Sequence, residues 1–347
     1  MTEKFTTERK RQIMMELVSG GSGSGKSAYA EDLICAVYRS ICTSVEDTRK
    51  RPSLYYIASM GHYGEETEEK IAAHRKQRDG KGFHTLEWYT GLEEHLSGPG
   101  CPVTEGSCVL LECISNLTAN EMYMEEGAGK NTVEAITDGI RLLKERCAYV
   151  VVVTNDVFAE SVMDSKEMKE YKRVLGQINR NLAQMADRVT RIVYGVRCPV
   201  SGMEEDSEDP EEQRNTEKNK KTTLKIVTGG AFQGKKRYAD TICPGRIWTD
   251  GASCPLEEIR MCTAIEHFHL FIRRWMKEGR TKEELLDAIE ENGRDIIIVC
   301  DEIGCGLVPT NAFERSYRET TGRIMSELAG RAERVDQVVC GIGRRIK

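Results

Sequence analysis

The 347-residue sequence predicts an α/β fold, in which a mostly parallel sheet carries helices on both faces, duplicated along the chain. Two observations support this fold class. Short runs of Val, Ile and Leu alternate with helical patterns, which is typical of buried parallel strands. A glycine-rich turn follows the first apolar run, and a similar turn recurs in the second half of the chain.

The predicted strands are short apolar stretches that are separated by helical patterns. In the first half they are MMELVS, SLYYIAS, SCVLLEC, AYVVVVTN and TRIVYGV. In the second half they are TLKIVTG, DIIIVCDE and QVVCGIG. The shorter second set repeats the order of the first, so we expect two related sheets.

Matching residues support an internal duplication. The first turn recurs 209 positions later, whereas VVVVTNDV (150–157) matches IIIVCDEI (296–303) at an offset of 146. The second copy is therefore about 63 residues shorter in its middle. It cannot perform the function that this segment has in the first copy. The recurring turn residues are Gly20, Gly25, Lys26, Tyr29 and Ala30, which return as Gly229, Gly234, Lys235, Tyr238 and Ala239.

Composition separates the two copies and excludes some functions. We divide the chain into an extension (1–14), a first copy (15–200), a charged linker expected to be disordered (201–222) and a shortened second copy (223–347).

A net charge of −6 gives no general attraction to nucleic acid or anionic lipid. Thirteen scattered cysteines without a C-x-x-C pair predict a reducing cytoplasm. We expect neither export nor membrane insertion, because no apolar run approaches the ~20 residues that span a bilayer.

The first turn, GGSGSGKS (20–27), fits the pattern G-x-x-x-x-G-K-S between a strand and a helix. Small residues let backbone amides wrap around phosphate oxygens, so this context predicts a P-loop of the NTPase type rather than an accidental match. Lys26 is expected to reach the β- and γ-phosphates, and Ser27 to ligate Mg²⁺. The predicted nucleotide-binding residues here are Gly20, Gly21, Ser22, Gly23, Ser24, Gly25, Lys26 and Ser27.

The P-loop also needs an acidic group at the end of a neighbouring strand to hold the metal. Glu112, which closes CVLLE, is the candidate, with a buried or capping carboxylate as the alternative. The second turn keeps Gly234 and Lys235 but has Lys236 in place of the serine. A cation should repel Mg²⁺ there, so we predict a phosphate-binding or purely structural loop.

His74 lies in EKIAAHRKQRDGKGFHTLE (69–87), part of the segment that the second copy lacks. Arg75, Lys76 and Arg78 follow it on a predicted helix and could hold a triphosphate. An imidazole can attack an α-phosphate and form a phosphoramidate. Spacing alone favours the alternative, a solvated histidine beside basic residues.

Taken in order, these motifs resemble the bifunctional adenosylcobinamide kinase/adenosylcobinamide-phosphate guanylyltransferases of cobalamin assembly. They include MELVSGGSGSGKSAYAE, YYIAS, KIAAHRKQRDGKGFHTLE, VLLECISNLTAN and VVVVTND, and the second copy adds DEIGCGLVP, YRETTGR and VVCGIGRRIK. The resemblance implies that the chain phosphorylates adenosylcobinamide with GTP or ATP and Mg²⁺. It further implies transfer of GMP from GTP to adenosylcobinamide phosphate through a guanylylated histidine.

The resemblance also assigns residues and an assembly. His74 matches the family's guanylylated histidine, although Lys70 stands where the family has arginine. It implies that Ala58, Ser59, Glu87 and Glu112 lie at the nucleotide, where we also expect Arg75 and Arg78. The family's assembly is a trimer with sites near subunit boundaries, which implies a homo-oligomer.

Each copy departs from the family pattern where the other is intact. VFAESVMD follows Asp156, whereas the second copy keeps the glycines of DEIGCGLVP, and Lys172 and Gln177 stand where the second copy has Arg318 and Arg323. We therefore expect that the segment after Asp301 completes a site built on the first copy. Two alternatives stay open: a kinase that has lost guanylyl transfer, and a second copy that only binds nucleotide or supports oligomerisation.

Overall fold

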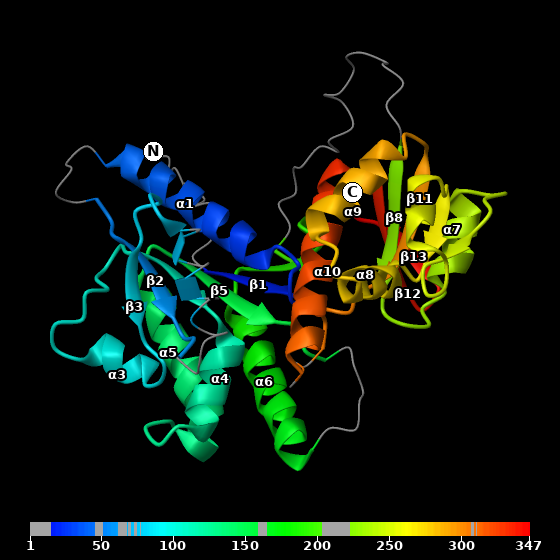
Figure 1. Cartoon of the computed structure of the whole chain (residues 1–347). Helices are drawn as coiled ribbons and strands as arrows, with labels where there is room; N and C mark the ends of the chain where they lie inside the picture. The colour runs from blue at the N-terminus through cyan, green and yellow to red at the C-terminus, as the bar shows by residue number, and fades with distance from the viewer. Residues whose placement is uncertain are drawn as a thin grey trace, which may run out of the picture.

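The computed structural model describes residues 15–45, 51–61, 68, 71–72, 75–76, 78–158, 165–202, 223–306, 309 and 311–347. The predicted extension (1–14), most of the predicted linker (203–222) and His74 lie outside these residues. Two sheets with flanking helices make up the described chain (Figure 1). None of the described helices is both long and apolar enough to span a membrane.

The first sheet has the strand order β3-β2-β4-β5-β1-β6-β7. All neighbouring strands run parallel except β6 and β7, which are antiparallel. The carboxyl ends of β1 to β5 therefore meet at one edge of the sheet, where ligands bind in open α/β sheets. The strands are β1 (Met15–Gly20), β2 (Leu54–Ala58), β3 (His84–Glu87), β4 (Cys108–Glu112), β5 (Tyr149–Asn155), β6 (Arg188–Val193) and β7 (Val196–Ser201).

Helices cover both faces of this sheet, as the apolar runs predicted. Alternate residues of one strand point to opposite faces, so a strand that is buried on both faces is apolar throughout. In β5, Val150 and Val152 pack in the cluster that includes α3 to α6, whereas Val151 and Val153 pack with α1. The helices are α1 (Lys26–Ser44), α3 (Leu92–Ser97), α4 (Ile114–Tyr123), α5 (Thr132–Arg146) and α6 (Lys166–Met185), with a 3₁₀ turn, η2 (Gly129–Asn131).

The second sheet repeats this topology in a reduced form. Its order is β13-β12-β8-β11-β10-β9, so β8, β11 and β12 have the neighbours that β1, β5 and β6 have in the first sheet. Its strands are β8 (Leu224–Gly229), β9 (Thr249–Asp250), β10 (Ala264–Glu266), β11 (Ile296–Asp301), β12 (Arg334–Val339) and β13 (Ile342–Arg345). Its helices are α7 (Lys235–Ile242), α8 (Phe268–Lys277), α9 (Lys282–Glu291) and α10 (Ala312–Arg331), with a 3₁₀ turn, η4 (Leu256–Arg260).

Two predicted strands were wrong as single strands. TRIVYGV and QVVCGIG each cross a tight turn that joins two antiparallel strands. The turn residues Tyr194 and Gly195 have φ values of 49° and 77°, and Cys340 and Gly341 have 50° and 82°. Two consecutive residues of positive φ suit the twist of a two-residue hairpin, but Tyr and Cys give no sequence signal for one.

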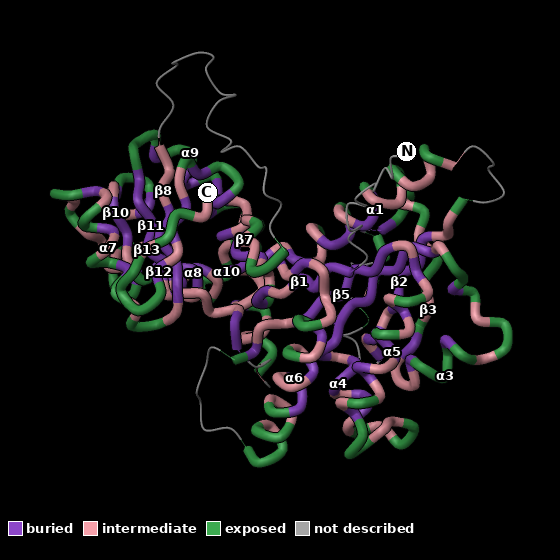
Figure 2. The backbone as a smooth tube through the Cα atoms, turned by 180° about the vertical axis from the view of Figure 1, so that it is seen from behind, coloured by how far each residue is buried: buried purple, intermediate pink, exposed green. Residues whose placement is uncertain are grey.

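The two copies pack against each other, and α10 lies between the two sheets (Figure 1). Val193 and Tyr194 of the first copy belong to the core cluster that fills the second copy. The Tyr194 hydroxyl also donates to the Asp301 carbonyl at 3.1 Å. Figure 2 shows that buried residues run through both sheets and along the face of α10. Residues of the first copy thus form part of the hydrophobic core of the second copy.

Candidate active site

The first glycine-rich turn forms a loop between β1 and α1. Gly23 and Gly25 take φ values of 69° and 86°, a region that glycine enters without steric cost. The buried Lys26 ammonium group donates to the Gly21 carbonyl at 3.1 Å. Burial lowers the pKa of Lys26, while Cys113 and Glu112 act in the opposite direction. A phosphate beside this ammonium group would favour its charged form.

Ser27 and Glu112 meet beside this loop. The Ser27 hydroxyl donates to one oxygen of the Glu112 carboxylate. The Tyr56 hydroxyl donates to the other oxygen at 3.0 Å. Hydroxyl and carboxylate oxygens are the ligands that Mg²⁺ takes from proteins, together with phosphate and water oxygens. The described residues contain no group of three or more His, Cys, Asp or Glu side chains that could hold a metal.

Two buried polar atoms near the loop are unsatisfied. Arg78 is 7% exposed, and its guanidinium carbon lies 3.5 Å from the centroid of the Tyr56 ring. Its Nη1 atom has no hydrogen-bond partner, and neither has the buried hydroxyl of Ser24 in the loop. Buried donors are normally paired, so each of these two atoms is suited to an anionic ligand.

The remaining predicted site residues lie at the ends of β2 and β3 or outside the described residues. Arg75 pairs with Glu87 at 2.6 Å, and both side chains are exposed at the end of β3. Ala58 ends β2. The Ser59 hydroxyl accepts from the Cys113 amide at 2.7 Å and donates to the Cys113 carbonyl, so it ties β2 to the end of β4. His74 lies outside the described residues.

The second copy covers the first loop. The Ser22 amide donates to the Gly304 carbonyl at 2.9 Å, and the Ser326 hydroxyl donates to the Gly23 carbonyl at 3.1 Å. At the same boundary, Arg191 pairs with Glu302 at 2.9 Å. The segment after Asp301 therefore reaches the loop of the first copy.

Sequence reasoning missed several residues that shape the site. Tyr56 holds Glu112, and Arg191 joins the two copies, yet both read as ordinary strand residues. In the second copy, Glu266 beside the second glycine loop was also missed, although it closes its strand as Glu112 does and lies two residues before a helix. That spacing was the one available signal.

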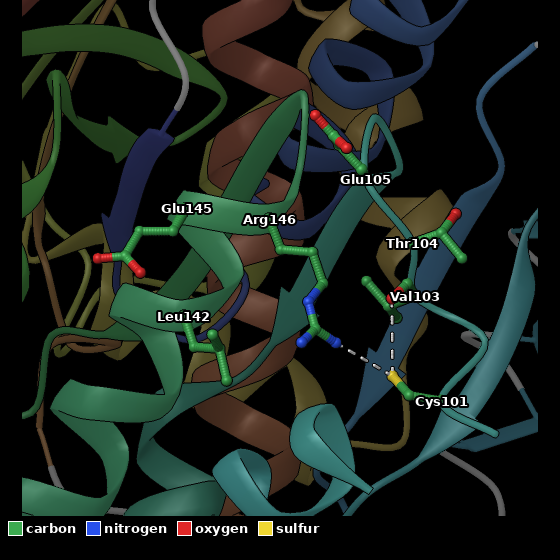
Figure 3. A pocket seen from close by; sticks show the side chains of 7 residues that line it. All are labelled: Cys101, Val103, Thr104, Glu105, Leu142, Glu145 and Arg146. Carbon is green, nitrogen blue, oxygen red and sulfur yellow. Dashed lines mark hydrogen bonds between the residues drawn. The ribbon is translucent and has the colours of Figure 1, made fainter. Parts of the chain in front are cut away.

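A hollow of about 580 Å³ lies elsewhere on the first copy (Figure 3). Arg146 extends into it and donates to the Cys101 sulfur at 3.8 Å. Arg146 ends α5 just before β5 begins, so the hollow lies near the amino ends of the strands, opposite the glycine loop. It is open and lacks a phosphate-binding loop, so we do not assign the nucleotide to it. Its lining residues are Cys101, Val103, Thr104, Glu105, Leu142, Glu145 and Arg146.

Comparison with known proteins extends these observations. The chain is 30% identical over 202 residues to the "Bifunctional adenosylcobalamin biosynthesis protein CobU" of Salmonella typhimurium, covering 54% of this chain and 99% of that protein. It is 28% identical over 198 residues to the protein of the same name from Escherichia coli, with 54% and 99% covered. A CobP protein of Pseudomonas aeruginosa is 26% identical over 193 residues, with 54% and 98% covered.

A family model described as "Cobinamide kinase / cobinamide phosphate guanyltransferase" matches residues 16–200 and 261–346. These two segments include the glycine loop with Ser27 and Glu112, and also the part of the second copy that covers the loop. The match extends over well more than half of the chain, and we conclude that this chain belongs to the cobinamide kinase/cobinamide phosphate guanyltransferase family.

Proposed function

We propose that the chain phosphorylates the aminopropanol hydroxyl of adenosylcobinamide and then transfers GMP from GTP to the resulting phosphate. The product is adenosylcobinamide-GDP, an intermediate of cobalamin biosynthesis. The observation that carries this proposal is the Ser27–Glu112 hydrogen bond beside the first glycine loop. It brings a metal-binding hydroxyl and a carboxylate together from α1 and β4, as phosphoryl transfer requires.

In the kinase step, the loop amides and Lys26 position the phosphates of ATP or GTP. The substrate hydroxyl attacks the γ-phosphorus, the bond from the γ-phosphorus to the bridging oxygen breaks so that the diphosphate leaves, and the hydroxyl proton is released to solvent. Ser27 and Glu112 would hold Mg²⁺, which would supply positive charge to neutralise the phosphate oxygens. Arg78 is suited to stabilise the same oxygens, because its unpaired Nη1 atom is buried beside Tyr56.

In the guanylyl step, an imidazole nitrogen of His74 attacks the α-phosphorus of GTP and pyrophosphate leaves. The phosphate of adenosylcobinamide phosphate then attacks the same phosphorus, and the phosphorus–nitrogen bond breaks. His74 is assigned from the resemblance to the family and lies outside the described residues. Arg75 and Arg78 follow it, and the contact of Arg78 with Tyr56 connects this segment to Glu112.

Labelling with α-labelled GTP and Mg²⁺ tests the guanylyl step. We expect a label that survives base and is lost in acid, in a fragment N-terminal to the charged linker, because a phosphorus–nitrogen bond at imidazole has this stability. His74→Ala should abolish labelling and GMP transfer while most phosphorylation from ATP remains. Label on His267 or His269, or an unlabelled wild type that still phosphorylates its substrate, would contradict the bifunctional assignment and favour a kinase alone.

The kinase site is tested with a matched pair of lysines. Lys26→Ala should lower the rate of adenosylcobinamide phosphorylation by about 10²-fold or more, since losing one electrostatic contact to the transferred phosphate typically lowers the rate by that factor. Lys235→Ala, at the same position of the second loop, should have a much smaller effect. Normal phosphorylation by the Lys26 variant would exclude the first loop as the site.

Homo-oligomerisation is part of the proposal, and light scattering of the full chain measures the number of chains in the assembly.

A further inference from the structure

The second glycine loop keeps the backbone shape of the first. Gly234 has a φ of 80° where Gly25 has 86°, and Phe232 has 58° where Gly23 has 69°. Lys235 donates to the Gly230 carbonyl at 2.6 Å, as Lys26 donates to that of Gly21. A two-residue hairpin also donates to each loop: Gly195 to the Ser24 carbonyl at 2.7 Å, and Gly341 to that of Gln233 at 3.0 Å. The second loop is therefore still folded as a phosphate cradle.

The metal position differs between the two loops. Lys236, which stands where the first copy has Ser27, places its ammonium nitrogen 2.5 Å from a carboxylate oxygen of Glu266. Glu266 ends β10 beside β11, as Glu112 ends β4 beside β5. The lysine ammonium group thus pairs with the carboxylate that corresponds to the metal's partner in the first copy.

The phosphate position differs as well. The Lys235 ammonium group, 7% exposed, pairs with the Asp301 carboxylate at 2.7 Å. Asn155 is the counterpart of Asp301 in the first copy, and its amide donates to the Ser115 hydroxyl at 2.6 Å. The two lysines and two carboxylates of the second loop sum to zero charge. A triphosphate would have to displace Asp301, and it would meet Glu266 without a metal between them.

We propose that the second loop is a latent nucleotide site that is closed by its own side chains. Lys236 replaces Mg²⁺ beside Glu266, and Asp301 replaces the phosphates beside Lys235. One nucleotide then binds per chain, at the first loop, an expectation that rests on the proposed function. Substituting the two residues of the first copy, Lys236→Ser and Asp301→Asn, should reopen the second loop to a magnesium nucleotide.

Calorimetric titration of the full chain with Mg·ATP, which carries no guanylyl group to transfer, tests this inference. We expect one site in the wild type and none after Lys26→Ala. Adding Lys236→Ser and Asp301→Asn to the Lys26→Ala chain should restore one site that requires Mg²⁺, with affinity at least tenfold above that of Lys26→Ala alone. As a control in the same Lys26→Ala chain, Arg237→Ser with Asp301→Asn removes an adjacent exposed cation but leaves the Lys236–Glu266 pair, and should restore no site.

Each result decides one question. Two sites in the wild type, or one that persists after Lys26→Ala, would overturn the closed second loop. So would a triple variant that keeps its circular dichroism spectrum and melting temperature yet binds no nucleotide. A wild type that binds none would instead overturn the proposed function of the first loop, and the triple variant would still report on the second.

Discussion

Gly322 in α10 lies directly against the first glycine loop, so Gly322→Ala tests whether the second copy covers that loop. A Cβ atom at Gly322 would lie 2.7 Å from the Gly23 Cα atom and 2.7 Å from the Ser22 carbonyl oxygen. Both are backbone atoms, so neither can rotate away as a flexible side chain could. The substitution must move either α10 or the loop. Gly330 lies two turns further along the same helix, and a Cβ atom there would meet nothing within 4 Å.

The two substitutions share the same gain in helix propensity, but only Gly322→Ala also overpacks its surroundings. Replacing glycine by alanine inside a helix stabilises it by about 1 kcal/mol, and this gain applies to both positions. Overpacking typically costs about 1–3 kcal/mol, and it applies to Gly322 alone. We therefore expect Gly330→Ala to raise the free energy of unfolding by up to about 1 kcal/mol and Gly322→Ala to leave it unchanged or lower it by up to about 2 kcal/mol. The difference between the two variants measures the overlap.

Urea unfolding of both variants gives this difference, and titration with Mg·ATP shows whether the loop has moved. A distortion of the loop that costs about 1.4 kcal/mol of binding free energy would weaken nucleotide binding tenfold in Gly322→Ala. Gly330→Ala should bind as the wild type does. If Gly322→Ala matches Gly330→Ala in stability and in nucleotide affinity, α10 does not pack on the first glycine loop, and the second copy does not cover that loop.

Three further predictions concern the same region. Glu302→Ala should lower the free energy of unfolding in urea by about 1–3 kcal/mol, because it removes the nearer of the two carboxylates that pair with the half-buried Arg191 and leaves Asp156 at 3.4 Å and the Cys305 sulfur at 3.7 Å; an unchanged midpoint would contradict a stabilising contact. Tyr56→Phe should cost about 1 kcal/mol of stability and raise the Mg²⁺ concentration needed for phosphorylation, since one Glu112 oxygen loses its donor; an unchanged Mg²⁺ titration would refute this role. At pH 8 iodoacetamide should modify the exposed Cys340 and spare Cys305, because burial raises the pKa of Cys305 to about 12 and thiolate forms only near that pH; mass spectrometry that finds Cys305 modified first would exclude its burial.

The sequence alone determined the features that depend on neighbouring residues. Strands buried on both faces are mainly apolar, so β4 and β5 could be located from their composition, and β1 from its shorter run Leu17–Val18 before the glycine-rich turn. The glycine pattern of 20–27 predicts its own backbone shape, because positive φ angles favour glycine. The Ser27–Glu112 pair also followed, since parallel strands bring their carboxyl ends to one edge of the sheet.

Only the tertiary structure decided which segments bury one another. Hydrophobic periodicity reports that a face is covered but does not identify its partner. The bond from Ser326 to Gly23 joins residues 303 positions apart, and nothing local to either residue predicts it. The closed second loop also depends on tertiary structure. In the sequence Lys236 only indicates the loss of a metal ligand, whereas in the fold β10 brings Glu266 to its ammonium group. Charge compensation depends on distance in space, and this distance is fixed only when the sheet forms.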